Sequence, residues 1–232
     1  MSKLCVITGV GAGNGASFSR RFTREGYRVV MLARNLAYLE TLAKEIPGSV
    51  AMECDVRDPD AIRDVFARIH EEIGTVDTLI YNAGAGEWAS IMDTSLEGMQ
   101  SSWATNTLGL VACAQQVIPS MTENGEGNIM VIGATASLRG GAQSTAFASA
   151  KAAQRSVAQS MARDLGTKGI HVGYLIIDGI IDIERTRERF PDRADDFFMQ
   201  PDAIADSVYA LTQQDRSAWA FEIDLRPYGE KW

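Results

Sequence analysis

Basic side chains are in the minority in this chain of 232 residues, with 22 Lys and Arg against 30 Asp and Glu and a formal net charge of −8. Nucleic acid and anionic membrane surfaces bind clusters of positive charge, so this balance argues against either as a partner. Long apolar runs are also missing. The N-terminal run in "MSKLCVITG" reaches glycine before it attains the length of a signal segment or a membrane span, and no other stretch is long enough to span a membrane. We therefore expect a cytoplasmic protein.

Cysteine and histidine are scarce as well, with three and two residues. Cys5, Cys54 and Cys113 are scattered and form no CxxC pair, which favours buried free thiols in a reducing compartment over disulfides or metal ligands. Neither His70 nor His171 has a second candidate ligand at metal-binding spacing, so we expect no metal site and a structural role for His171.

Short apolar, β-branched runs alternate with helical patterns along almost the whole chain. Strands are expected at 3–9, 27–33, 49–56, 78–84, 127–134, 170–177 and 220–227, and helices at 16–26, 35–46, 59–74, 96–124, 144–168 and 201–214. Asn35 is expected to cap the second helix, and Pro59 to stand in the first turn of the third. Such alternation predicts an α/β fold, a doubly wound parallel sheet of about seven strands with helices on both faces, as a single domain over residues 1–232.

One segment, at about 178–200, is rich in Asp, Arg and Phe and shows no regular pattern. It follows the end of a strand, and ligands of doubly wound sheets bind beyond the carboxyl ends of the strands. We therefore expect a lid here. Its arginines could meet an anionic substrate, but they alternate with acidic residues, which favours a solvated surface.

The stretch "TGVGAGNGAS" joins the first expected strand to the first helix. Its glycines would let the backbone approach a pyrophosphate, which then meets the N-terminus of the helix. A tight turn without a ligand is the alternative, but the position within a βαβ unit favours a nucleotide site. The glycines are Gly9, Gly11, Gly13 and Gly15.

The end of the second expected strand reads Ala33-Arg34. A site for NAD(H) usually has a carboxylate there, which accepts from the ribose 2′-hydroxyl. The guanidinium of Arg34 suits a 2′-phosphate instead, so the pattern favours NADP(H) over NAD(H). A solvent-facing arginine at the start of a helix is the alternative.

These motifs resemble, in order and spacing, those of the short-chain dehydrogenases/reductases. "TGVGAGNG" is similar to the family's TGxxxGxG loop, "YNAG" to its NNAG strand end, and "TAFASAK" ends in a lysine that matches YxxxK. The resemblance implies a Rossmann fold, a nicotinamide cofactor, a small-molecule substrate, and self-association to a dimer or tetramer through the two long helices. The cofactor contacts that it implies, besides the four glycines and Arg34, are Asn14, Asp55, Val56, Asn82, Ala83, Gly84, Lys151, Gly179 and Ile180.

The resemblance fails at the residues that do the family's chemistry. Phe147 stands at the position of the family's proton-transferring tyrosine, and Ala134 at that of its serine, whereas Asn106 and Lys151 match its asparagine and lysine. Between Ala134 and Lys151 there is no Tyr, His, Asp or Glu. Asp178, just past a strand end, and Lys151 itself are therefore the candidate proton donors, and a turn residue is the alternative role for Asp178.

Other side chains near the expected cleft are weaker candidates. A slipped register would present Thr135, and Ser144 lies one helical turn before Phe147 but is a poor general acid. Trp88 and Trp103 are expected near the cleft, either packed in the protein or stacked on a substrate.

Two functions remain open. The first is a divergent NADP(H)-dependent oxidoreductase that acts on a small carbonyl, alcohol or enone and takes its proton from Asp178, Lys151 or water. The second is a catalytically inactive nicotinamide-nucleotide-binding sensor or scaffold. The absence of both hydroxyls favours the second, and the presence of Lys151 and Asn106 favours the first, which we prefer.

Overall fold

A computed structural model describes residues 2–229, and its centre is a seven-stranded parallel sheet in the order β3-β2-β1-β4-β5-β6-β9. The strands are β1 (Leu4–Thr8), β2 (Arg28–Ala33), β3 (Val50–Glu53), β4 (Thr78–Tyr81), β5 (Gly127–Ile132), β6 (Ile170–Ile177) and β9 (Glu222–Leu225). Chain order reverses between β1 and β4, the position at which doubly wound sheets open a crevice. The predicted Rossmann-type sheet is confirmed.

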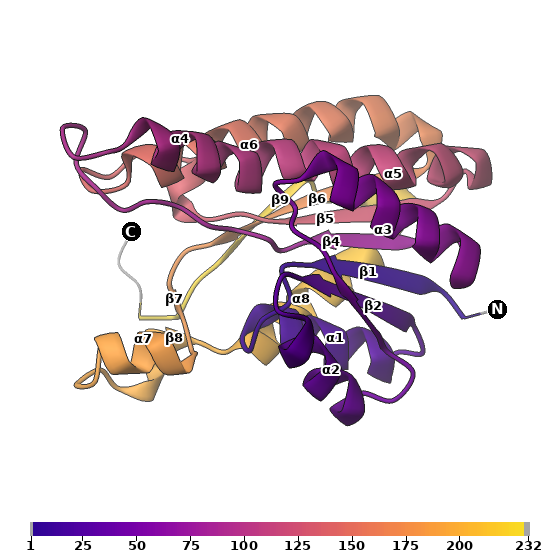
Figure 1. The fold of residues 1–232 in the computed structure, drawn as a ribbon, viewed down its shortest axis with the longest axis horizontal. Helices are drawn as coiled ribbons and strands as arrows, with labels where there is room; N and C mark the ends of the chain where they lie inside the picture. Colours follow the sequence, from indigo (N-terminus) through magenta and orange to yellow (C-terminus); the bar gives the residue numbers. More distant parts are fainter. Residues whose placement is uncertain (1, 230–232) are drawn as a thin grey trace.

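Helices cover both faces of the sheet (Figure 1). One face carries α1 (Asn14–Arg24), α2 (Leu36–Glu45) and α8 (Pro201–Thr212), and the other carries α3 (Pro59–Glu72), α5 (Gly109–Asn124) and α6 (Thr145–Leu165). Short 3-10 turns lie at Thr135–Ser137, Gly166–Lys168, Asp195–Phe197 and Arg216–Ala218. Because both faces are covered, β1 and β6 are buried along their whole length, as their continuous apolar runs predict.

The starts of two helices confirm the capping predictions. The side chain of Asn35 accepts from the amide of Tyr38 at the start of α2. Pro59 is the first residue of α3, where its missing N–H is not needed, and Asp58 caps that helix.

The long helix expected at 96–124 is divided by a π-helical turn. It begins as α4 (Leu96–Trp103), passes through the π-helical turn Ala104–Leu108 and continues as α5. Such turns widen the helix locally and are frequent at functional sites. Asn106 lies in the middle of this one, which the unbroken helical pattern of the sequence did not indicate.

The segment expected to be irregular is in fact ordered in part. β7 (Ile180–Ile181) pairs in parallel with β8 (Phe198–Met199), and α7 (Glu184–Arg189) lies between them. Arg187 holds the segment together, because its guanidinium pairs with Asp182 at 2.6 Å and Asp195 at 2.7 Å. The segment projects beyond the carboxyl ends of the strands (Figure 1).

The three cysteines and His171 contribute to the packing of the core. All three cysteines are buried and free, and burial raises the pKa of each thiol. His171 is buried in β6, stacks on Trp219 at 4.8 Å and places its Nε2 2.9 Å from the Ala220 carbonyl. Within residues 2–229, no three His, Cys, Asp or Glu side chains gather as metal ligands. No helix of that described range is both long and apolar enough to cross a membrane.

Candidate functional site

A cleft of about 790 Å³ lies at the carboxyl ends of β1, β2 and β4, a size common for small-molecule sites. The predicted cofactor contacts that line it are Gly9, Gly11, Arg34, Asp55, Val56, Asn82, Ala83 and Gly84. The others, Gly13, Asn14, Gly15, Lys151, Gly179 and Ile180, lie outside this lining. The structure therefore brings together most of the predicted contacts from four separate stretches of the chain.

Two glycines fix the shape of the loop between β1 and α1. Gly9 has φ +67°, and a Cβ there would lie 2.5 Å from Ala83 Cα. A Cβ at Gly15 would lie 2.5 Å from Val10 Cα. Both positions therefore need glycine for close backbone packing. A Cβ at Gly11 meets nothing within 4 Å of the protein, so this part of the loop faces the cleft.

The segment after β6 reaches the same loop. A Cβ at Gly13 would lie 2.7 Å from Ile183 Cγ2, which shows that this isoleucine packs on the loop. Thr186 fixes the backbone there, since its Oγ1 donates to Ile181 O at 2.5 Å and accepts from the Ile183 amide at 3.1 Å. Ile181 and Ile183 therefore lie against the glycine loop, in backbone that Thr186 holds in place.

The mouth of the cleft carries two guanidinium groups. Arg34 is exposed and makes no ion pair within residues 2–229. Arg57 holds the carboxylate of Asp55, with Nη2 to Oδ2 at 2.5 Å and Nε to Oδ1 at 3.0 Å. The hydrogen bonds from Arg57 lower the pKa of Asp55, and the charge of Arg34 lowers it further. Arg57 was not among the predicted contacts. Its position two residues after Asp55, in the stretch "DVR", is the signal that could have indicated it.

Asn106 follows Thr105, which lines the cleft, and is itself fully buried. Its Nδ2 donates to Ala85 O at 2.6 Å and to Ser102 O at 2.7 Å. Its Oδ1 has no hydrogen-bond partner in the described part of the chain. A Cβ at Gly84 would lie 3.5 Å from both Asn106 Oδ1 and Lys151 Nζ. These two polar atoms therefore face one small space, next to a glycine that lines the cleft.

Lys151 is buried with uncharged acceptors. Its Nζ donates to Ile132 O at 2.9 Å and to Gln154 Oε1 at 3.0 Å. Burial lowers its pKa from 10.5 to about 7, because desolvation penalises the ammonium form. The amine can therefore exist in both protonation states near neutral pH, which is a useful property in a proton donor.

Phe147 lies near Lys151, and neither its side chain nor that of Ala134 offers a hydroxyl. The ring of Phe147 packs on the backbone of Gly86 and against Trp88, with ring centroids 4.7 Å apart, and Lys151 Nζ lies 5.9 Å from its centroid. Ala134 has extended backbone after β5, and its carbonyl accepts from Ser137 Oγ at 2.6 Å.

Asp178 and Thr135 form a contact between neighbouring strand ends. Thr135 Oγ1 donates to Asp178 Oδ1 at 2.5 Å, and the Asp178 amide donates to Leu225 O at 2.8 Å. This arrangement fits the turn role considered for Asp178 and turns the hydroxyl of Thr135 toward β6. Ser144 bonds with its Oγ to the backbone of the turn before α6.

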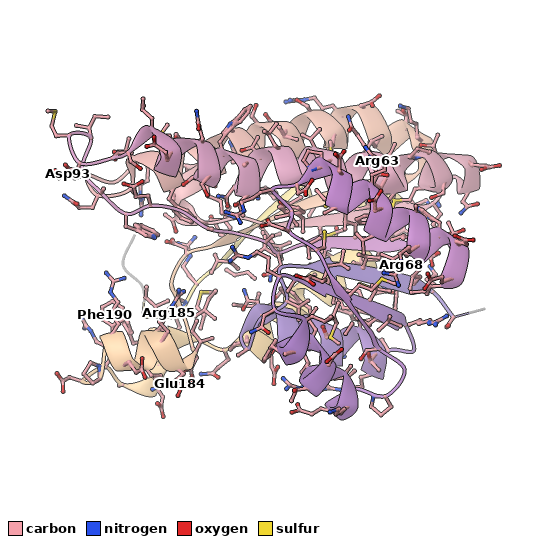
Figure 2. The ribbon with its side chains drawn as sticks, viewed as in Figure 1. Arg63, Arg68, Asp93, Glu184, Arg185 and Phe190 are labelled. Carbon is pink, nitrogen blue, oxygen red and sulfur yellow. The ribbon has the colours of Figure 1, made fainter. Side chains whose placement is uncertain are left out.

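Two projecting segments lie at this end of the molecule. Figure 2 shows Asp93 at the tip of the loop that precedes α4, and Arg185 and Phe190 on the segment that contains α7. Trp88, in the same loop as Asp93, is 64% exposed. The side chains of both segments therefore border the approach to the carboxyl edge of the sheet.

The strand order and the glycine-lined cleft define a doubly wound α/β protein of the Rossmann class. Residues 3–194 match the short chain dehydrogenase family, so the chain belongs to this family of oxidoreductases.

Individual relatives support the same placement. The chain is 33% identical to a solved short-chain dehydrogenase from Rhodopseudomonas palustris, with a TM-score of 0.85 over 97% of this chain and 99% of that one. It is 29% identical over 188 residues to carbonyl reductase family member 4 of Danio rerio, which covers 80% of this chain and 78% of the relative. An alcohol dehydrogenase from the archaeon Thermococcus sibiricus, 22% identical, shares the fold with a TM-score of 0.89 over 100% of this chain and 99% of that one.

The two kinds of glycine in the loop should respond differently to substitution. Gly15→Ala should destabilise the protein by about 1–3 kcal/mol, because the added methyl overlaps the Val10 backbone. Gly11→Ala should leave the free energy of unfolding within about 0.5 kcal/mol of the parent value, because its methyl meets open space. Urea unfolding measures both changes. Equal destabilisation by the two substitutions would contradict this description of the loop.

Proposed function

We propose that this chain is a divergent NADP(H)-dependent oxidoreductase that acts on a small carbonyl, alcohol or enone and uses Lys151 as its proton donor. The observation that carries the proposal is the buried amine of Lys151, which shares one small space with the unpartnered Oδ1 of Asn106 beside Gly84, a residue that lines the cleft. The carbonyl reductase relative supports a carbonyl substrate.

The residues present fit a bound dinucleotide. The backbone at Gly11 is open to the cleft and precedes the N-terminus of α1, where a pyrophosphate is favoured. The unpartnered Oδ1 of Asn106 and the Nζ of Lys151 would hold a hydroxyl group between them. When bound, the nicotinamide supplies or accepts the hydride.

The choice of NADP(H) over NAD(H) rests on the mouth of the cleft. Arg34 is free to pair with a 2′-phosphate, whereas Arg57 is already held by Asp55. A carboxylate that would accept from a 2′-hydroxyl is missing at the end of β2, where Ala33 precedes Arg34. Asp55, Val56, Asn82 and Ala83 would then line the adenosine side of the cleft.

The proton is assigned to Lys151 for two reasons. It is the titratable group nearest to the space that Asn106 Oδ1 faces, and burial lowers its pKa to about 7, toward neutral pH. In the direction of reduction, the ammonium form would donate a proton to the substrate oxygen and become the neutral amine. Asp178 is the alternative donor, but its carboxylate already accepts from Thr135.

One observation favours the second function, a nicotinamide-nucleotide-binding sensor or scaffold without catalysis. Phe147 and Ala134, the side chains at the positions where the family resemblance places the tyrosine and the serine, carry no hydroxyl. Binding of the nucleotide would need only the cleft, Arg34 and the space beside Asn106. The two functions therefore differ in turnover and not in binding.

We further propose a lid role for residues 178–200, within a single domain formed by residues 1–232. Gly179 and Ile180 begin the segment, and its Ile183 already packs on the glycine loop. The ion pairs of Arg187 would keep β7, α7 and β8 together as the segment moves.

We also propose self-association through the face formed by α4, α5 and α6. A groove of about 490 Å³ lies between these helices. Its apolar lining includes Trp103, Val111, Ile118, Val157 and Met161, and Trp103 is 46% exposed. A twofold contact between two copies would cover this surface.

The ribose-phosphate role of Arg34 is tested by its removal. Arg34→Ala should weaken NADPH binding at least tenfold and leave NADH binding nearly unchanged, because only NADPH carries the 2′-phosphate. Calorimetry measures both affinities. Arg63→Ala, on the outer surface of α3 (Figure 2), is the matched control and should change neither. Equal losses for both nucleotides would contradict the assignment.

Catalysis is tested by NADPH consumption with a panel of small carbonyls and enones. The parent protein should turn over slowly, and Lys151→Met should be inactive. Phe147→Tyr combined with Ala134→Ser should be faster than the parent by about 10²–10⁴-fold, because a phenol beside the amine of Lys151 has its pKa lowered and acts as general acid.

Each result of this turnover experiment has a clear meaning. A parent protein that binds NADPH and is inert with every compound favours the sensor or scaffold function. A double variant that folds, binds NADPH and stays inert contradicts the placement of Phe147 and Ala134 at the catalytic positions.

Self-association is tested by light scattering. The protein should have the mass of a dimer or tetramer at micromolar concentration, because the apolar groove is too exposed for a lone copy. Val157→Glu should reduce that mass, since it would bury a charge at the contact. A monomeric parent would refute the proposed contact.

A further inference from the structure

Gln154 lies three residues after Lys151 on α6 and is fully buried. Its Nε2 donates to the backbone carbonyl of Asn106 at 2.9 Å, and its Oε1 accepts from Lys151 Nζ at 3.0 Å. A buried amide is costly unless it is hydrogen-bonded, and here both of its ends have partners. The glutamine therefore connects the π-helical turn to the amine of Lys151.

The carbonyl that Gln154 binds belongs to the π-helical turn between α4 and α5. In this turn the amide of Gly109 donates to Ala104 O, five residues back, as a π-helix requires. Asn106, between them, presents its carbonyl to Gln154 and its side-chain amide to Ala85 O. The turn, the glutamine and the lysine thus form one hydrogen-bonded unit.

The hydrogen-bonded unit leaves one N–H donor of the Lys151 ammonium group without an acceptor among the described residues. An ammonium group has three N–H donors. Ile132 O and Gln154 Oε1 take two of them, and no acceptor within residues 2–229 takes the third. In the neutral amine the same two acceptors hold both hydrogens, and a lone pair replaces the third. Gly84 lies next to this amine and to Asn106 Oδ1, since a Cβ there would be 3.5 Å from each.

We propose that Gln154 is a positioning residue, which together with the Ile132 carbonyl fixes two hydrogens of Lys151 and directs the third toward the cleft. What this hydrogen does there rests on the proposed function. The orientation and the proton affinity that Gln154 gives to the amine do not depend on it, and they can be measured in the free protein.

The surroundings of Lys151 make the contribution of Gln154 measurable. The titratable side chain that faces this unit from β6 is Tyr174, whose hydroxyl lies 3.4 Å from Gln154 Oε1 and from Lys151 O, and burial raises its pKa to about 12. β5 and the π-helical turn contribute only uncharged groups, and burial alone accounts for the lowered pKa of Lys151. Near neutral pH, the amine therefore titrates without a charged neighbour.

Two substitutions of Gln154 should move the pKa of Lys151 in opposite directions. Gln154→Met removes the acceptor at similar size, so the ammonium loses a hydrogen bond and the pKa should fall by about one unit below its parent value near 7. Gln154→Glu supplies a carboxylate at the same place, and the pKa should rise by about two units. A residue that only filled space would produce no such opposite pair.

The measurement is a pH titration of the lysine side-chain carbon next to Nζ by NMR, in protein labelled at lysine. Lys151→Met identifies the signal, because it removes that resonance. Tyr174→Phe is the matched control, since it removes a weaker donor to the same glutamine oxygen and leaves the acceptor for Lys151 in place. It should move the pKa of Lys151 by less than about 0.3 units.

The outcomes separate this inference from the proposed function. Opposite shifts in the two variants support the positioning role, and turnover whose pH profile follows those shifts supports the use of the free hydrogen in catalysis. Opposite shifts in a protein that never consumes NADPH support the positioning role and count against the oxidoreductase. Folded variants that leave the pKa of Lys151 within about 0.3 units of the parent overturn the inference. If the Met variant does not fold, an unshifted Glu variant overturns it equally.

Discussion

The amine of Lys151 is buried beside uncharged partners, next to the point where Gly84 lines the cleft. A cation removed from water is unstable unless polar groups replace the lost hydration. Here the replacements are a backbone carbonyl at the end of β5 and the side-chain amide of Gln154. They satisfy two of the three donors of the ammonium form, and burial lowers the pKa of the amine to about 7.

The sheet places this amine next to the cleft. Because β1, β4 and β5 are neighbours, the loops after them meet at one edge. The close approach of Gly9 to Ala83 brings the glycine loop against the end of β4, and the next residue, Gly84, faces both Lys151 and Asn106. The amine therefore lies beside a residue that lines the cleft.

Because Phe147 has no hydroxyl, Lys151 has no phenol at this position whose pKa it could lower. Where a phenol is present, a neighbouring ammonium can stay charged and tune it. With a phenyl ring there, the proposed reaction takes its proton from the amine itself, and a pKa of about 7 suits that task. The same arrangement would also bind a ribose without reaction, which is why the substrate-dependent loss of NADPH decides between the two functions.

Most of the fold follows from local sequence patterns. The apolar runs, the glycine loop, the cap at Asn35 and the proline at the start of α3 all act over a few neighbouring residues, so the strands, the helices and the parallel sheet could be predicted. Lys151 and Asn106 could be singled out by their motifs. The sequence by itself thus determined the Rossmann-type architecture and the edge of the sheet at which to look.

Tertiary structure decided the rest, because the contacts concerned join residues far apart in the chain. The π-helical turn is invisible in an unbroken helical pattern, and the link from Gln154 to the Asn106 carbonyl spans 48 positions. The pairing of Thr135 with Asp178, the contact of Ile183 with the glycine loop and the short strands inside the segment 178–200 have the same origin. Whether a polar side chain is free or already bonded depends on which partners the fold brings to it, and only the packed chain fixes that.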